Sequence, residues 1–354
     1  MKSLGNFPDP FIAEIAGQPD ALRRAAAAAI RQEAQLSRAA AVATRGTLLF
    51  AGMGSSYDGC YPAVSDLAAA GMPALMLDAA ELLHFRLAVL TSEDLLVLVS
   101  QSGESAETVA VAQALRSTRQ PPTIVSITNG IGNSLSELAD IALDTDAGPE
   151  TGPSTMTFAA SLVLLGALAR SISGVSGAGA SIAGSAELAA ASVERLVQQE
   201  DLPPRLAAWH GGRTTTVILG RGAARAAAEM GALTLKEAVG IGVESLQAAQ
   251  FRHGPVELAG PDLAAIVIAT EPETAELDLG LAADLYGLGA AVLVISAADA
   301  ELSGVETIAI GALDRLLAPA ASIVPVQLLA WTLATAHGRT PGTYVHAAKV
   351  TTRE

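Results

Sequence analysis

Charged side chains, and basic ones above all, are scarce in this chain. Asp, Glu, Lys and Arg make up 16% of the 354 residues, against about 25% in a typical soluble protein. The 21 basic residues are outnumbered by 36 acidic ones, which gives a net charge of −15, and no run of Lys or Arg interrupts the acidity. Nucleic acids and membranes are therefore excluded as expected partners.

Cysteine is almost absent, and the first residues lack an apolar leader. The single cysteine, Cys60, excludes an internal disulfide and a cysteine-based metal cluster, and it fits a reducing compartment. The opening residues MKSLGNFPDPF carry Pro and Asp where a signal peptide needs an apolar run. We expect a cytoplasmic protein with a buried Cys60 thiol, no metal and no cofactor.

Apolar residues, in contrast, are abundant. They make up 51% of a 35.7 kDa chain, which is more apolar material than a single domain with one core can bury. We therefore expect two domains and an oligomer. The segment 317–336 approaches the length of a membrane-spanning helix, but it contains Pro325, Gln327 and Thr332. We interpret it as a buried helix at an interface.

Short apolar segments alternate with longer helical patterns through the first half. The predicted strands are residues 47–52, 73–77, 95–100, 123–128 and 141–144, and the helices that follow include 55–70, 105–116, 134–139 and 157–171. This alternation predicts an α/β fold, a doubly wound parallel sheet flanked by helices.

The same order begins again after a Gly/Ser/Ala-rich stretch and Pro203-Pro204. Predicted strands at 215–220, 263–269 and 291–296 alternate with helices at 223–239, 274–287 and 314–337, so the halves look like copies. We expect domains at 43–175 and 203–340, joined by a linker helix at 176–202. An N-terminal helical segment, 1–42, is predicted to break at Gln18-Pro19, and residues 341–354 form a tail.

Three loops rich in Ser and Gly, at 52–56, 100–105 and 152–157, follow predicted strands. Backbone N–H groups, hydroxyls and a helix N-terminus together bind phosphate without Lys or Arg. One such loop is an ordinary helix cap, but three indicate a sugar phosphate. A dinucleotide site would use Gly52, Gly54 and Asp78, yet Tyr57 replaces the third glycine and the 100–105 loop would have no role.

These loops resemble the SIS (sugar isomerase) family. Residues 54–57, GSSY, resemble its G-T/S-S-Y loop, residues 100–105, SQSGES, resemble S-Q-S-G-E-T, and residues 14–19 are similar to its E-I-x-x-Q-P segment. The resemblance implies two tandem SIS domains. It also implies that the phosphate and the sugar hydroxyls are held by Gly54, Ser55, Ser56, Ser100, Gln101, Ser102, Ser105, Ser154 and Ala348.

The second half and the tail extend the resemblance. Residues 229–255 resemble the family's catalytic helix and the loop after it, and residues 348–351, AKVT, resemble the tail whose lysine faces the sugar carbonyl. Aldose–ketose interconversion needs a base, a ring-opening group and positive charge near the enediolate. The resemblance implies Glu237, His253 and Lys349 for these roles, with His253 entering the partner's site in a homodimer. Lys349 could form a Schiff base or act electrostatically.

The match is nearest to the isomerase half of glucosamine-6-phosphate synthase and its deaminase and deglycase relatives. Thr234 and Met156 stand where that pattern has lysine, and no glutaminase segment precedes the match, so we expect no use of glutamine. We expect an enzyme that isomerises or deaminates a hexose or amino-hexose phosphate. A fructosamine-phosphate deglycase and a non-catalytic sugar-phosphate-binding protein remain alternatives.

Overall fold

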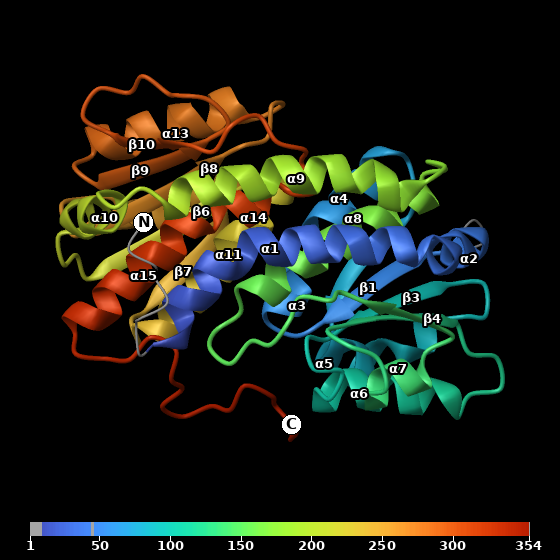
Figure 1. Cartoon of the computed structure of the whole chain (residues 1–354). Helices are drawn as coiled ribbons and strands as arrows, with labels where there is room; N and C mark the ends of the chain where they lie inside the picture. Colours follow the sequence, from blue (N-terminus) through green and yellow to red (C-terminus); the bar gives the residue numbers. More distant parts are fainter. Residues whose placement is uncertain (1–8, 44–45, 354) are drawn as a thin grey trace. The chain divides into compact units, whose positions relative to one another are not determined.

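The computed structural model describes residues 9–43 and 46–353 and contains two five-stranded parallel sheets (Figure 1). The strand orders are β2-β1-β3-β4-β5 and β7-β6-β8-β9-β10. The strands are β1 Leu48–Gly52, β2 Ala74–Asp78, β3 Leu95–Val99, β4 Thr123–Thr128, β5 Ile141–Asp144, β6 Thr215–Gly220, β7 Val243–Gln247, β8 Leu263–Ala269, β9 Ala291–Ser296 and β10 Glu306–Ala309. The same order in both sheets confirms the predicted α/β plan of two copies.

The first sheet lies in a unit made of Asp20–Glu150, Met156–Glu187 and His346–Glu354, here called the first-sheet unit. Buried Leu49, Leu96 and Leu98 of the sheet pack in one cluster with Val111 and Leu115 of the helix after β3. Its helices are α2 Glu33–Ala43, α3 Ser55–Asp58, α4 Tyr61–Ala69, α5 Ala79–Glu81, α6 Ala106–Arg116, α7 Ser134–Leu138 and α8 Met156–Ile172. In Figure 1, α5, α6 and α7 lie together on one side of this sheet.

The second sheet lies in a unit made of Met1–Pro19, Thr151–Thr155 and Leu188–Val345, the second-sheet unit. Its helices are α10 Leu202–His210, α11 Arg225–Ala238, α12 Ala248–Phe251, α13 Ala275–Gly287, α14 Ala318–Ser322 and α15 Val324–Ala336. Buried Val217, Val267 and Val294 pack with Phe251 and Leu281 from α12 and α13. Two long helices, α1 Pro10–Arg31 and α9 Ala178–Val197, contribute residues to both units.

The predicted break at Gln18-Pro19 is wrong, because α1 continues through Pro19. Proline has no N–H to offer the carbonyl four residues earlier, so a proline inside a helix ordinarily leaves that acceptor unpaired. Here the Gln18 side chain takes over, since its Nε2 donates to the Ile15 oxygen at 3.1 Å. The same nitrogen donates to Oε1 of Gln327 at 2.8 Å, and both side chains are fully buried.

The strands β7 and β10 have no counterpart among the sequence predictions. Both lie at an edge of the second sheet. Their residues are mostly half-buried or exposed, and β10 has only four of them. Edge strands tolerate polar residues, so neither segment shows the apolar run that marks a central strand.

The apolar C-terminal segment is a core element of the second-sheet unit. Residues Ala318–Ala336 are long and apolar enough to cross a membrane, yet 83% of this window is buried inside the protein. The predicted helix over 314–337 is divided into α14 and α15 and starts later than expected. Cys60 is buried, as predicted, and burial together with the charge of Asp58 raises the pKa of its thiol.

Candidate active site

The serine loop, residues 100–105, leaves β3 and enters α6 in the first-sheet unit. The hydroxyls of Ser100 and Ser105 lie 3.0 Å apart, and the Ser100 hydroxyl accepts from the Gly103 N–H at 3.1 Å. The Ser102 hydroxyl accepts from the Glu104 N–H at 3.1 Å. Ser102 and Ser105 are half-buried. Hydroxyls and N–H groups therefore gather where α6 begins, the geometry that binds oxyanions.

Gly103 fixes the shape of this loop. Its φ is +68°, in the left-handed region that favours glycine, and a Cβ there would lie 1.9 Å from Oδ1 of Asn133. Asn133 caps α7, and its Oδ1 accepts from the Ser136 N–H at 2.9 Å. The Gly103 oxygen also accepts from the Leu135 N–H at 3.0 Å, so the loop rests against the start of α7.

Glu104 points to the same segment and adds a second link to α7. Its carboxylate accepts from the N–H and the hydroxyl of Ser134 at 2.8 and 2.7 Å. These two hydrogen bonds lower the pKa of Glu104, which is otherwise exposed. The Glu104 carboxylate is thereby bound to the first residue of α7, where two hydrogen-bond donors of Ser134 stabilise its charge.

The glycine loop, residues 52–56, leaves the neighbouring strand β1. Gly54 has φ +51°, and the Ser56 N–H donates to the Met53 oxygen at 3.2 Å, which closes a tight turn at the start of α3. Gly52 allows close packing, because a Cβ there would lie 2.9 Å from the Val99 oxygen of β3. Ser55 and Ser56 are half-buried.

Both loops lie at the point where the order of the first sheet reverses. From β1 the chain crosses to β2 on one side, and β3 lies on the other. In open parallel sheets, ligands bind outside the carboxyl ends of the strands at such a switch point. The structure thus brings Gly54, Ser55, Ser56 and the serine loop to the same edge of one sheet.

The C-terminal tail reaches the first-sheet unit at two places. The Thr351 oxygen accepts from the Ala106 N–H at 3.0 Å, at the first residue of α6. The Lys349 ammonium donates to Oε2 of Glu150 at 2.6 Å. The Lys349 side chain is 20% exposed, whereas that of Glu150 is fully buried. Ala348, the other tail residue of the predicted site, is exposed.

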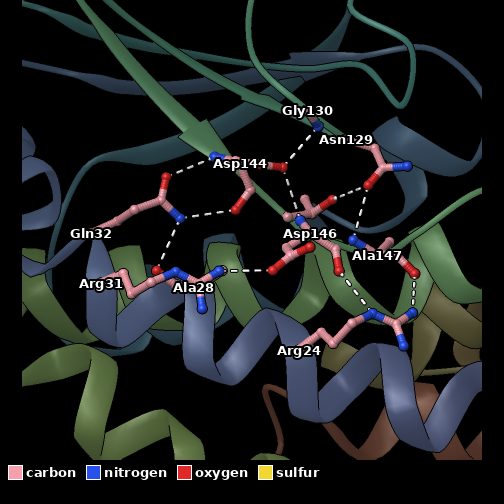
Figure 2. A network of polar contacts seen from close by, with 10 residues as sticks. Arg24, Ala28, Arg31, Gln32, Asn129, Gly130, Asp144, Asp146 and Ala147 are labelled. Carbon is pink, nitrogen blue, oxygen red and sulfur yellow. Dashed lines mark hydrogen bonds and ion pairs between the residues drawn. The ribbon is translucent and has the colours of Figure 1, made fainter.

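Glu150 is not among the residues predicted from the sequence, although it stands two residues before the third Ser/Gly loop. The segment that leads to it is held by a network between α1 and the ends of β4 and β5 (Figure 2). Gln32 pairs with both backbone groups of Asp144, at 2.8 and 2.9 Å. The Asp144 carboxylate accepts from the Gly130 N–H at 2.7 Å, and Arg31 pairs with Asp146 at 2.7 Å. These contacts, with the bond from the Ala147 N–H to Oδ1 of Asn129, fix the backbone to within three residues of Glu150.

The third loop is divided between the two units. In the second-sheet unit, the buried Glu14 carboxylate accepts from the Thr151 N–H at 2.6 Å and from the Gly152 N–H at 3.2 Å. The Tyr344 hydroxyl donates to the Gly152 oxygen at 3.1 Å. Ser154, predicted to bind the ligand, is buried with 8% exposure. Glu14, the acidic residue of the N-terminal motif, therefore has a structural role, because its carboxylate binds the backbone N–H groups of Thr151 and Gly152.

Glu237 and His253 lie in the second-sheet unit, on α11 and just after α12. Glu237 is half-buried, and His253 is exposed. The two lysine replacements are both buried. Thr234 donates its hydroxyl to the Met230 oxygen of its own helix at 2.8 Å, and Met156, at the start of α8, is 8% exposed.

The corresponding switch point of the second sheet is filled by its own side chains. Gly222 repeats the φ of +51° of Gly54, and the next N–H, that of Ala223, donates to the Glu271 carboxylate at 3.1 Å. Burial raises the pKa of Glu271, while Arg315 and the Ala223 N–H lower it in part. Since the first sheet has hydroxyl-rich loops at this position and the second has a carboxylate, the first is the better phosphate site.

Together, these groups allow chemistry on a phosphorylated carbonyl compound. A hydroxyl- and N–H-rich loop can hold a phosphate in a protein whose net charge is −15. An ammonium held by the tail can stabilise negative charge on a carbonyl oxygen. Glu237 and His253, the residues predicted for proton transfer, belong to the second-sheet unit.

The sequence of the chain is similar to a known domain family and to known enzymes. A model of the SIS domain matches residues 42–171 and 213–336. The isomerizing glutamine–fructose-6-phosphate aminotransferase of Pyrobaculum aerophilum is 28% identical over 369 aligned residues, covering 100% of this chain. The chain spans 59% of the length of that relative.

Two solved structures share the fold. The C-terminal domain of glucosamine-fructose-6-phosphate aminotransferase from Francisella tularensis has a TM-score of 0.83 at 22% identity, covering 96% of this chain and 98% of that one. Glucosamine-6-phosphate deaminase from Thermotoga maritima has a TM-score of 0.70 at 20% identity, covering 92% and 99%.

Proposed function

From the premise that the chain belongs to the SIS domain family, we propose that it is an enzyme that isomerises or deaminates a hexose or amino-hexose phosphate. The observation that carries this proposal is the serine loop at the switch point of the first sheet, with the tail bound to the first residue of α6. The names of the aligned relatives, an isomerizing aminotransferase and a deaminase, support the same class of substrate.

The proposed phosphate site is the serine loop. Ser100, Ser102 and Ser105 supply hydroxyls, and the start of α6 supplies N–H groups. We assign the sugar hydroxyls to the glycine loop, Gln101, Ser154 and Ala348. This assignment agrees with the second sheet, where a buried carboxylate already occupies the matching position.

In the proposed reaction, Glu237 moves the proton between C1 and C2, and His253 opens the ring. Lys349 neutralises the charge that develops on the carbonyl oxygen. The Lys349 Nζ lies 2.6 Å from Oε2 of Glu150, and this position beside a carboxylate supports the electrostatic role. Borohydride reduction in the presence of substrate is then expected to leave no adduct on Lys349, whereas a Schiff base would be trapped there.

We further propose a cytoplasmic homodimer in which His253 completes the partner's site, with no cofactor. The 51% apolar content and the exposed His253 support this arrangement. Glu237→Gln protein mixed with His253→Ala protein should regain part of the activity through hybrid sites. Absence of recovery after demonstrated subunit exchange would argue against a shared site.

The test of the proposed function is turnover by the purified chain. It is incubated with glucosamine 6-phosphate, with fructose 6-phosphate plus ammonia, and with fructosamine phosphates, while ammonia and hexose phosphates are assayed. We expect turnover of glucosamine 6-phosphate or fructose 6-phosphate that Glu237→Gln abolishes. Release of free amine from fructosamine phosphates alone would identify a deglycase, and binding without turnover would identify a sensor.

A further inference from the structure

A buried carboxylate outside the predicted site contacts the one tail residue to which we assign chemistry. The Glu150 side chain is fully buried and lies 2.6 Å from the Lys349 ammonium. It also accepts from the N–H and the hydroxyl of Thr157, at 3.0 and 2.6 Å, in the first turn of α8. The carboxylate thus joins the tail to the start of a helix that is buried along nearly its whole length.

The energetics of such a contact are unlike those of a surface ion pair. An exposed pair contributes little, because water screens it. A buried carboxylate needs its donors and its counter-charge, and removal of one partner leaves a costly uncompensated charge. The Glu150 side chain is buried and the Lys349 side chain is one-fifth exposed. Separation of the pair would leave a buried, uncompensated carboxylate, so the paired position of the ammonium is favoured.

The position of Glu150 is set independently of the tail. Thr157 donates to both oxygens of the carboxylate, and the network of Figure 2 holds the backbone leading to Glu150. The tail has a second attachment, from the Ala106 N–H to the Thr351 oxygen. A fixed carboxylate and a fixed helix end therefore define where residues 349–351 lie.

We propose that Glu150 is the positioning residue of the tail: it holds the Lys349 side chain beside the start of α8 and thereby keeps the tail against the start of α6. Its effect on turnover rests on the proposed function, whereas its effect on the tail does not. A displacement of about 1 Å at a reacting group lowers the rate about 10²-fold. Loss of the Glu150 carboxylate is therefore expected to lower the rate by displacing Lys349.

The experiment measures hydrogen exchange in the tail, residues 346–353, and steady-state kinetics in the same proteins. Glu150→Gln keeps the size of the side chain and an acceptor for Thr157 but removes the charge. Glu187→Gln is the matched control, because it removes the same charge from an exposed pair with Arg23. Lys349→Met removes the pair from the other side, at a residue whose loss leaves α8 intact.

For Glu150→Gln we expect tail exchange to accelerate at least about tenfold and kcat to fall about 10²-fold. Glu150→Asp should recover part of both, and Glu187→Gln should match the wild type. Tail exchange at the wild-type rate in Glu150→Gln overturns the proposal. If that variant does not fold, unchanged exchange in Lys349→Met overturns it.

Kinetics and exchange together separate this proposal from the proposed function. Faster tail exchange in a protein whose wild type turns over no phosphosugar supports the tail contact and contradicts the enzymatic function. Normal kcat for Glu150→Gln, in a wild type that is active, contradicts the role of Glu150 in positioning Lys349.

Discussion

Replacement of Gly103 by Ala tests whether the backbone of the serine loop determines ligand binding. The left-handed φ of +68° costs an alanine about 1–2 kcal/mol. The new Cβ would also lie 1.9 Å from Oδ1 of Asn133, so the cap of α7 must move, at a further cost of about 1 kcal/mol. We expect the free energy of unfolding to fall by about 3 kcal/mol and phosphosugar affinity to fall by at least about tenfold.

The matched control is Gly71→Ala. Gly71 has φ +82° in the turn after α4, but a Cβ there meets nothing within 4 Å. This variant isolates the backbone cost, about 1–2 kcal/mol, and should bind the ligand normally. Urea denaturation gives the free energies of unfolding, and calorimetric titration with a sugar phosphate gives the affinities. Equal losses of stability in both variants would contradict the contact between Gly103 and Asn133, and normal binding by Gly103→Ala would contradict the role of the loop in binding.

The remaining predictions concern binding, a buried ion pair and pH. Ser102→Ala should raise KM about tenfold with kcat retained, because a hydrogen bond to a charged group is lost; Ser117→Ala, at the far end of α6, should not. Arg221→Met should destabilise the protein by about 3–5 kcal/mol, since Asp278 is then left 1% exposed without its partner at 2.6 Å, and Asp278→Leu in the same chain should restore most of the loss by urea denaturation. Burial raises the folded-state pKa of Glu271 above its ordinary 4.5, so its ionisation opposes folding: the penalty is absent below pH 4.5 and complete above the raised pKa. Glu271→Gln should therefore gain stability relative to the wild type as pH rises from 4 to 8, and a relative loss would contradict the sign.

The fold could be predicted from the sequence where apolar runs and turn residues agree. The strands β4, β5, β6, β8 and β9 have the predicted bounds, because each is a short run followed by a turn. The edge strands β7 and β10 were not predicted, because their polar, mostly half-buried residues dilute the apolar signal. The helix break predicted at Pro19 is wrong for a different reason. The side chain of Gln18 replaces the backbone N–H that proline lacks, so α1 continues.

The candidate site divides along similar lines. The serine and glycine loops could be found, because their composition carries the chemistry and parallel topology places them at one edge. Glu150 could not be found, because a single acidic residue in a loop does not indicate a role in the sequence. Its role follows only from the fold, which buries it beside Lys349. The roles of Glu237, His253 and Lys349 rest on resemblance and stay predictions.

We propose above that the serine loop binds the phosphate of a sugar on which the chain acts. The most direct measurement is a structure determined after soaking with glucosamine 6-phosphate or fructose 6-phosphate. We expect the phosphate between the Ser102 and Ser105 hydroxyls at the start of α6, with the sugar carbonyl facing Lys349. A phosphate bound at the strand ends of the second sheet, with Ser102 and Ser105 without ligand contacts, would contradict it.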